Sequence, residues 1–133
     1  MTRLKTPLNH KAVQAGARMV EFAGWEMPVQ FSSLLKEHQA VRNQAGMFDI
    51  SHMGVFLIEG EKAKDALQHL VPTDLYRIGP GEACYTVLLN NKAGIIDDLI
   101  IYDLGIKEKN KESLIIVVNA SRTKDDVEWL REK

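Results

Sequence analysis

Two stretches near the start of the chain have the residue pattern of short helices. The first runs from Pro7 to Gly16, because proline suits the first turn of a helix and glycine commonly ends one. The second begins at Ser32 or Ser33, whose hydroxyl can accept a free backbone N–H, and it ends at Gly46. Residues of one face of this second helix recur at Leu34, His38, Val41 and Ala45.

Two further helices are predicted later in the chain. Apolar residues over 63–70 recur at helical spacing, and the proline that follows closes that helix. The last helix begins after Asn119 or Ser121, either of which can cap it, and it has two aspartates in its first turn. Trp129 and Leu130 form its inward side.

Runs of β-branched and aromatic residues predict strands between these helices. The predicted strands cover 19–22, 47–51, 53–58, 84–89, 95–102 and 114–118. Residues 24–28 break the periodicity and predict a loop that carries Trp25, whose indole can cap the core or form the wall of a pocket, with the first role favoured. The short turn between 84–89 and 95–102 favours a hairpin. This order of elements is typical of an α+β fold, with an antiparallel or mixed sheet and flanking helices.

Composition and charge narrow the class of protein. The chain has 133 residues, 45% of them hydrophobic, which is the usual content of one globular domain. Its 17 basic and 18 acidic residues nearly cancel, so nucleic acid is not an expected partner. We expect no membrane span and no secretory signal. A single cysteine, Cys84, fits a reducing compartment, so we expect a cytoplasmic protein with Cys84 as a small apolar residue.

Several kinds of catalytic site find no support in the residue pattern. The four histidines lie far apart, and none has metal-ligand spacing with another, so no metal site is expected. The turn at 79–81 lacks the lysine and helix of a phosphate-binding loop. No Gly-x-Ser-x-Gly motif predicts a serine nucleophile.

An acidic pair, Asp97 and Asp98, stands out because apolar residues flank it on both sides. A buried carboxylate needs a partner or a bound proton. In a regular strand, Asp98 shares a face with Ile100 and Tyr102, and Asp97 lies on the other face. One interpretation is structural: the pair caps the turn after Gly94, a role we expect for Asp97 in particular. The other is functional: Asp98 accepts a hydrogen bond from an aromatic ligand.

Six blocks of the sequence follow, in order, the N-terminal pattern of one protein family. These blocks are 6–8, 22–28, 40–42, 46–54, 94–102 and 117–120, with Asp98 inside the acidic motif. The chain therefore resembles the aminomethyltransferases of the glycine cleavage system, also called T-proteins. The resemblance covers the entire chain, residues 1–133, as the N-terminal portion of the family's folate-binding domain. Where many members have a second glycine before Gly94, this chain has Ala93.

The resemblance implies an enzyme that uses tetrahydrofolate as its acceptor substrate and needs no metal. It would move the one-carbon unit from the aminomethyl group on the lipoyl arm of the H-protein to tetrahydrofolate, with release of ammonia. Asp98 would be the catalytic residue, because the family's acid hydrogen-bonds the folate and stabilises positive charge on the transferring carbon. The expected partners are the lipoylated H-protein and tetrahydrofolate.

The same resemblance places further folate contacts in this chain. They fall on Met53, Tyr85, Asp98, Ile100, Tyr102, Val117 and Asn119. Each has a plainer role as a core residue, a sheet aromatic or a helix cap. Because family members are much longer, we expect this chain to be truncated. Two alternatives stay open: a folate-binding relative, such as the folate domain of a sarcosine or dimethylglycine oxidase or an iron–sulfur assembly factor, and an inactive fragment.

Overall fold

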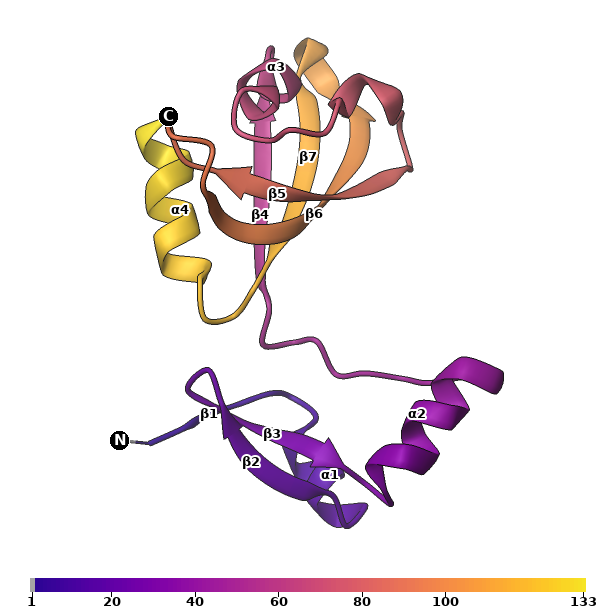
Figure 1. Cartoon of the computed structure of the whole chain (residues 1–133). Coiled ribbons are helices and arrows are strands. Elements are labelled where there is room, and N and C mark those ends of the chain that lie inside the picture. The colour runs from indigo at the N-terminus through magenta and orange to yellow at the C-terminus, as the bar shows by residue number, and fades with distance from the viewer. Residues whose placement is uncertain (1) are drawn as a thin grey trace. The chain divides into compact units, whose positions relative to one another are not determined.

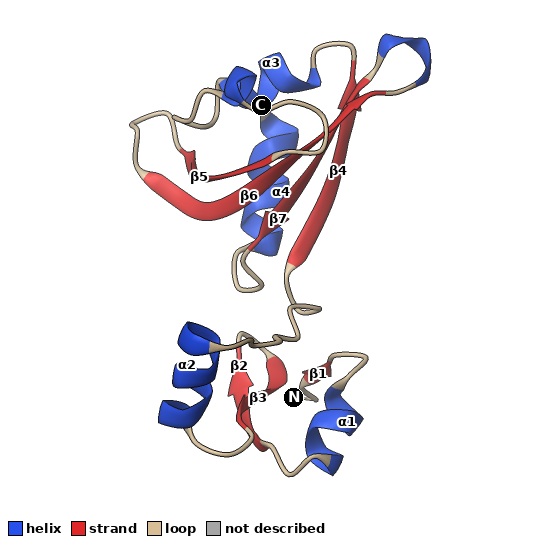
Figure 2. Ribbon diagram, turned by 90° about the vertical axis from the view of Figure 1, so that its right-hand side faces the viewer, coloured by secondary structure: helices blue, strands red, loops and turns tan. Residues whose placement is uncertain are grey.

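The computed structural model describes residues 2–133, which divide into two compact units. The boundary lies between His52 and Met53. Helices and strands occur in both units (Figures 1 and 2), and the sheets are antiparallel and mixed, so the predicted α+β class is confirmed. Each unit is described separately below.

The first unit contains a three-stranded sheet in the order β1-β3-β2. Its elements are β1 (Leu4–Lys5), α1 (Asn9–Gln14), β2 (Arg18–Phe22), β3 (Trp25–Gln30) and α2 (Leu34–Asn43). The predicted helices at 7–16 and 33–46 are therefore present but shorter. Ser33 caps α2, since its hydroxyl accepts a hydrogen bond from Lys36 N–H at 3.2 Å.

One loop prediction and one strand prediction in this unit are wrong. Of the predicted loop at 24–28, only Gly24 lies in a turn: residues 25–28 open β3, which forms a hairpin with β2 around Ala23 and Gly24, both at positive φ. Pro28 is tolerated there because β1 pairs only with Trp25 and Glu26, and the β2 pairing is irregular opposite Pro28. The predicted strand at 47–51 is absent, because no strand in the described residues pairs with that segment. Met47 is 94% exposed.

The second unit contains a four-stranded sheet in the order β4-β7-β6-β5, with every neighbouring pair antiparallel. Its elements are β4 (Gly54–Gly60), α3 (Ala63–Gln68), η1 (Leu75–Arg77), β5 (Ala83–Leu89), β6 (Ile95–Ile106), η2 (Glu108–Asn110), β7 (Glu112–Val118) and α4 (Thr123–Glu132). The hairpin predicted between 84–89 and 95–102 is confirmed as β5–β6. Ala93, in its turn, has a φ of 60°, a conformation that costs an alanine more than a glycine.

The hydrophobic core of this unit lies between one face of the sheet and the helices. Its buried members come from α3, the chain that follows it, β5, β6 and β7: Ala63, Leu67, Val71, Leu75, Leu88, Leu99, Ile101, Leu114, Ile116 and Val118. Trp129 and Leu130 of α4 pack against this cluster, as the helical pattern predicts. Gly54 lets α4 approach closely, because an added Cβ there would lie only 2.6 Å from Thr123 Oγ1.

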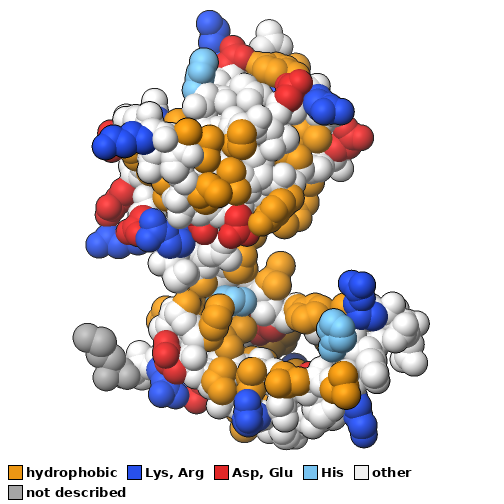
Figure 3. Space-filling model, in the orientation of Figure 1, with side chains coloured by type: hydrophobic (Ala, Val, Ile, Leu, Met, Phe, Trp, Pro, Cys, Tyr) orange, Lys and Arg blue, Asp and Glu red, His pale blue; other side chains and the backbone are white. Residues whose placement is uncertain are grey.

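The opposite face of the sheet is the surface on which most of the predicted site residues lie. Side chains alternate along β6, so buried Leu99 and Ile101 point to the core, while Ile100 and Tyr102 point away from it. Large hydrophobic residues on the outward positions are exposed, including Val55 and Leu57 of β4. Hydrophobic side chains are visible at the surface of both units (Figure 3). We call the outward side of the four-stranded sheet the open face.

Truncation of one residue on each face tests this division. Leu99 is 2% exposed and Leu57 is 60% exposed, on strands of the same sheet. We expect Leu99→Ala to lower the free energy of unfolding of the 133-residue chain by about 2–5 kcal/mol, because it leaves a cavity in the core. Leu57→Ala, the matched control, should cost less than about 1 kcal/mol. Urea unfolding followed by circular dichroism measures both, and equal losses would contradict the assignment of the faces.

Candidate functional site

The site is built on the start of β6, where the chain leaves its turn with β5. The burial pattern places Asp97 among the core residues and Asp98 on the open face. This is the separation that strand alternation predicts. Asp98 therefore projects from the sheet beside apolar outward residues.

The strand register brings the predicted contact residues together. Tyr85 of β5 pairs with Ile100 of β6, and Ile100 pairs in turn with Val117 of β7, so the three form one row across the open face. Tyr102 lies two residues further along β6 on the same face. Met53 and Asn119 flank this surface, since Met53 directly precedes β4 and Asn119 directly follows β7. Apolar and aromatic groups thus surround one carboxylate.

Two side chains hold the Asp98 carboxylate. The Tyr85 hydroxyl donates to Asp98 Oδ2 at 3.0 Å, and Asn119 Nδ2 donates to Asp98 Oδ1 at 3.0 Å. The hydrogen bond to Asp98, with burial and the charge of the carboxylate, raises the pKa of the Tyr85 phenol above its ordinary value. Each carboxylate oxygen keeps a second lone pair for a ligand donor.

Asp97 lies behind this site and is buried. Its carboxylate accepts from the Asn119 backbone N–H and from Asn119 Nδ2, both at 3.0 Å. The expected role of Asp97 as a turn cap is therefore wrong. Asn90 has that role, because its side-chain oxygen accepts from the backbone N–H groups of Lys92 and Gly94. The Asn90 amide lies in an exposed turn, where it accepts from the turn's own backbone. The Asp97 carboxylate is buried, and its hydrogen-bond donors come from Asn119 at the end of β7.

Asn119 has a different function from the predicted helix cap. The N-cap position of α4 is Arg122, and neither Asn119 nor Ser121 caps the helix through its side chain. The Asn119 amide hydrogens point instead to Asp97 and Asp98, including the backbone oxygen of Asp98 at 3.1 Å. Its side-chain oxygen is the group left to accept a hydrogen bond from a ligand.

Sequence reasoning missed Asp126, which is fully buried beside Asp97. Burial, and next the neighbouring Asp97, raise the pKa of Asp126 to about 7. From its position in the first turn of the helix, Asp126 was expected only to be an exposed carboxylate that interacts with the positive end of the helix dipole. A stronger signal was available, because Asp126 is three and four residues before inward-facing Trp129 and Leu130 and so shares their helix face.

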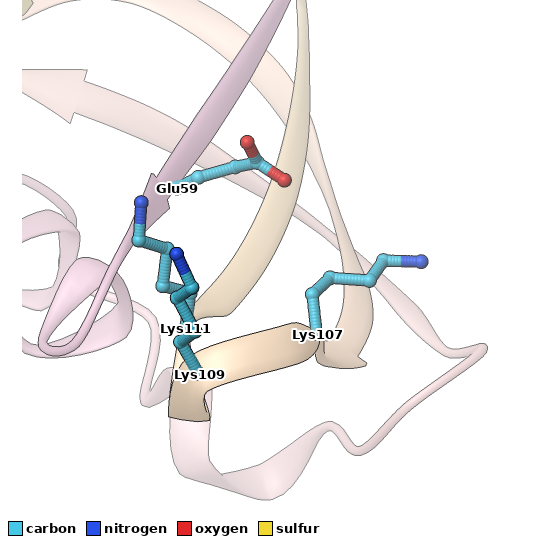
Figure 4. A pocket seen from close by; sticks show the side chains of 4 residues that line it. All are labelled: Glu59, Lys107, Lys109 and Lys111. Carbon is cyan, nitrogen blue, oxygen red and sulfur yellow. The ribbon is translucent and has the colours of Figure 1, made fainter.

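Other candidate features lie elsewhere. Glu59, Lys107, Lys109 and Lys111 line a hollow of about 470 Å³ at the far end of β6 and β7 from Asp98. Lys107 points away from the other two lysines (Figure 4), so their charges do not converge on one point. Within residues 2–133, no three His, Cys, Asp or Glu side chains are grouped to hold a metal ion. The same residues contain no helix long and apolar enough to cross a membrane.

Cys84 directly precedes Tyr85 on β5 but is not part of the site. It is half-buried and packs against the hydrophobic core, and burial raises the pKa of its thiol. A raised pKa disfavours the reactive thiolate. Cys84 therefore fits the predicted role as a small apolar residue.

The arrangement suits a flat ligand with N–H donors. Tyr85, Tyr102, Ile100 and Val117 offer an apolar surface on which an aromatic ring can lie. Asp98 offers a fixed negative charge at one edge of that surface, held by two hydrogen bonds. Such a carboxylate can orient a donor and can stabilise positive charge that develops nearby.

Comparisons with known proteins show which family this chain resembles. The family model described as the GCVT N-terminal domain matches residues 8–133. An aminomethyltransferase of Prochlorococcus marinus is 62% identical over 133 residues, which cover 99% of this chain and 36% of that protein. An aminomethyltransferase of a Synechococcus strain is 62% identical over 130 residues, covering 98% and 36%. The chain thus spans about a third of the length of these relatives.

A solved structure has the same fold. The crystal structure of glycine cleavage system aminomethyltransferase T from Bartonella henselae superposes with a TM-score of 0.85 at 37% sequence identity. The match covers 98% of this chain and 35% of that one.

The hydrogen bond between Tyr85 and Asp98 can be tested by titration. In Asp98→Asn the charged acceptor is lost, so we expect the raised pKa of the Tyr85 phenol to fall toward its ordinary value near 10. Tyr76 is the matched control: its hydroxyl contacts Asp65, which raises its pKa to about 12 independently of Asp98. NMR of ¹³C-labelled tyrosine rings reads both groups. An unchanged Tyr85 titration in the variant would show that the contact is absent.

Proposed function

The chain belongs to the GCVT N-terminal domain family, and on that premise we propose that residues 1–133 form the N-terminal portion of the folate-binding domain of a glycine cleavage aminomethyltransferase. In this proposal the whole protein takes the aminomethyl group from the lipoyl arm of the H-protein. Its one-carbon unit passes to tetrahydrofolate, ammonia leaves, and the lipoyl sulfur is returned as a thiol.

One observation carries the proposal: Asp98 projects from the open face of the sheet with both of its oxygens held. Tyr85 lies on β5 and Asn119 directly follows β7, and these are the two strands that pair with β6. The carboxylate is therefore fixed before any ligand binds. A fixed charge needs no reorganisation when positive charge develops beside it, which is the property that makes such groups effective in catalysis.

The open face supports tetrahydrofolate as the ligand. A pterin is flat and has N–H donors along its edge, and it matches the apolar row of Tyr85, Ile100 and Val117 with Asp98 beside it. Tyr102 extends the surface along β6, and Met53 directly precedes β4. Asn119 is suited to accept from a ligand donor through its side-chain oxygen, since its amide hydrogens are already used.

We assign Asp98 two tasks in the transfer. It accepts a hydrogen bond from the folate nitrogen that receives the carbon, which fixes the orientation of that nitrogen. It also stabilises the positive charge on the carbon while the bond to the lipoyl-borne donor is replaced, an effect that is stronger at a partly dry surface than in water. The lipoylated H-protein must therefore bring its arm to the open face.

Replacement of Asp98 tests the proposal. In the full-length protein, Asp98→Asn keeps the size and one acceptor oxygen but removes the charge. We expect transfer from the aminomethyl-loaded H-protein to tetrahydrofolate to slow by about 10²–10³-fold, the usual effect of losing one group that stabilises transition-state charge. Single-turnover formation of methylenetetrahydrofolate measures the rate.

The matched control is Asp125→Asn, an exposed carboxylate on α4 whose ion pair with Arg122 is at the surface. We expect it to keep the wild-type rate. An Asp98→Asn protein that transfers as fast as wild type would exclude Asp98 from the reaction. A complex with the H-protein in the same assay distinguishes this function from that of a folate-binding oxidase or assembly factor, for which no such complex is expected.

A further inference from the structure

Asp126 is a buried carboxyl group without an ordinary partner. Its side chain is 0% exposed, and neither of its oxygens accepts a hydrogen bond from a donor in residues 2–133. Carboxylates are almost never buried in this way unless they are paired or protonated. The α4 backbone supplies no explanation, because Asp126 belongs to the inward face of the helix with Trp129 and Leu130.

The neighbour of Asp126 across the core is Asp97, which lies within hydrogen-bonding reach of it. Two ionised carboxylates cannot share a hydrogen bond, because neither has a donor. One of the two must keep a proton, and Asp97 is the one that already accepts two hydrogen bonds from Asn119. These bonds favour the ionised form of Asp97, so the proton belongs on Asp126.

A continuous set of hydrogen bonds then leads from the core to the open face. The Asp126 hydroxyl donates to Asp97, Asp97 accepts from Asn119, and Asn119 Nδ2 donates to Asp98 Oδ1 at 3.0 Å. We propose that Asp126 is a positioning residue, whose neutral carboxyl group orients the Asp98 carboxylate through Asp97 and Asn119. The importance of this orientation for catalysis rests on the proposed function of Asp98. The orientation of the Asp98 carboxylate by Asp126 does not depend on that function.

Charged groups around Asp126 set the pH at which the arrangement is lost. Asp97 faces it from β6, and Arg122 and Asp125 lie beside it at the start of α4. Burial and Asp97 raise its pKa to about 7, Arg122 opposes the shift, and Asp125 adds to it. Because the folded pKa is above the ordinary value of 3.8, the folded protein binds the extra proton between these values. The stability from the neutral form is complete below pH 3.8 and is lost as pH rises through about 7.

Above that pH the carboxylates of Asp97 and Asp126 repel each other, and Asp97 is one of the two carboxylates to which Asn119 donates. We therefore expect the hydrogen bond between Asn119 and Asp98 to change as Asp126 ionises. A residue that only fills space in the core would produce no such change. The pH dependence of the Asn119 side-chain amide thus separates the two roles.

The first arm of the test needs neither folate nor the H-protein. In the full-length protein, NMR follows the Asn119 side-chain amide and the Asp126 carboxyl carbon between pH 5 and 9. We expect both signals to shift with a common midpoint near 7. In Asp126→Asn, whose amide can donate to Asp97 at every pH, the Asn119 shift should disappear. Asp125→Asn, the neighbouring exposed carboxylate, should keep it.

The second arm compares two replacements in the transfer assay. Asp126→Asn retains a donor and should keep the wild-type turnover number at pH 6.5, and it should retain it to higher pH than wild type. Asp126→Leu has a similar shape without a donor, so we expect its turnover number to fall by about 10-fold or more, the effect of losing one hydrogen bond to a charged group. The Michaelis constant for tetrahydrofolate should change less.

The inference is overturned if Asp126 titrates near its ordinary value, or if the Asn119 amide signal shows the same pH dependence in wild type and Asp126→Asn. If Asp126→Leu does not fold, the comparison of wild type with Asp126→Asn still decides the matter. Failure of the proposed function would be visible separately, as a normal transfer rate in Asp98→Asn while the NMR arm gives the expected shift.

Discussion

The Asp97 carboxylate, buried at the start of β6, is the constraint on which the site depends. A buried negative charge must be met by donors, and a single residue, Asn119, provides two of them, through its backbone N–H and its side-chain amide. These bonds tie the end of β7 to the start of β6. They also fix the Asn119 side chain, whose amide then reaches Asp98 on the other face. An inward carboxylate thereby determines the position of an outward one.

The sheet gives this constraint its functional setting. Regular alternation along β6 divides two adjacent aspartates between a packed core and an open face, with no need of a loop or a kink. The register then aligns Tyr85, Ile100 and Val117 in one row beside Asp98. Exposure of aromatic and apolar side chains to water is unfavourable in free energy. Their concentration around the Asp98 carboxylate is explained if a flat ligand covers them.

The sequence was most informative where a pattern depends on local geometry. Alternation predicted the separation of Asp97 from Asp98, and the short turn predicted the β5–β6 hairpin. It was less informative where long-range partners decide. Residues 24–28 contain a glycine and a proline and so resemble a loop, but β2 pairs with residues of 25–28 as a strand. Residues 47–51 are rich in strand formers, yet no described strand pairs with them. Asn119 resembled a helix cap, although carboxylates 21 and 22 residues earlier take its amide hydrogens.

The central claim is that the open face of the β4-β7-β6-β5 sheet receives the folate, with Asp98 at its edge. The most direct measurement is the set of NMR contacts between tetrahydrofolate and the ¹³C-labelled full-length protein. We expect pterin protons to contact the side chains of Tyr85, Ile100 and Val117, on the row beside Asp98. Contacts confined to the hollow lined by Glu59 and Lys111, or to residues of the first unit, would contradict the account.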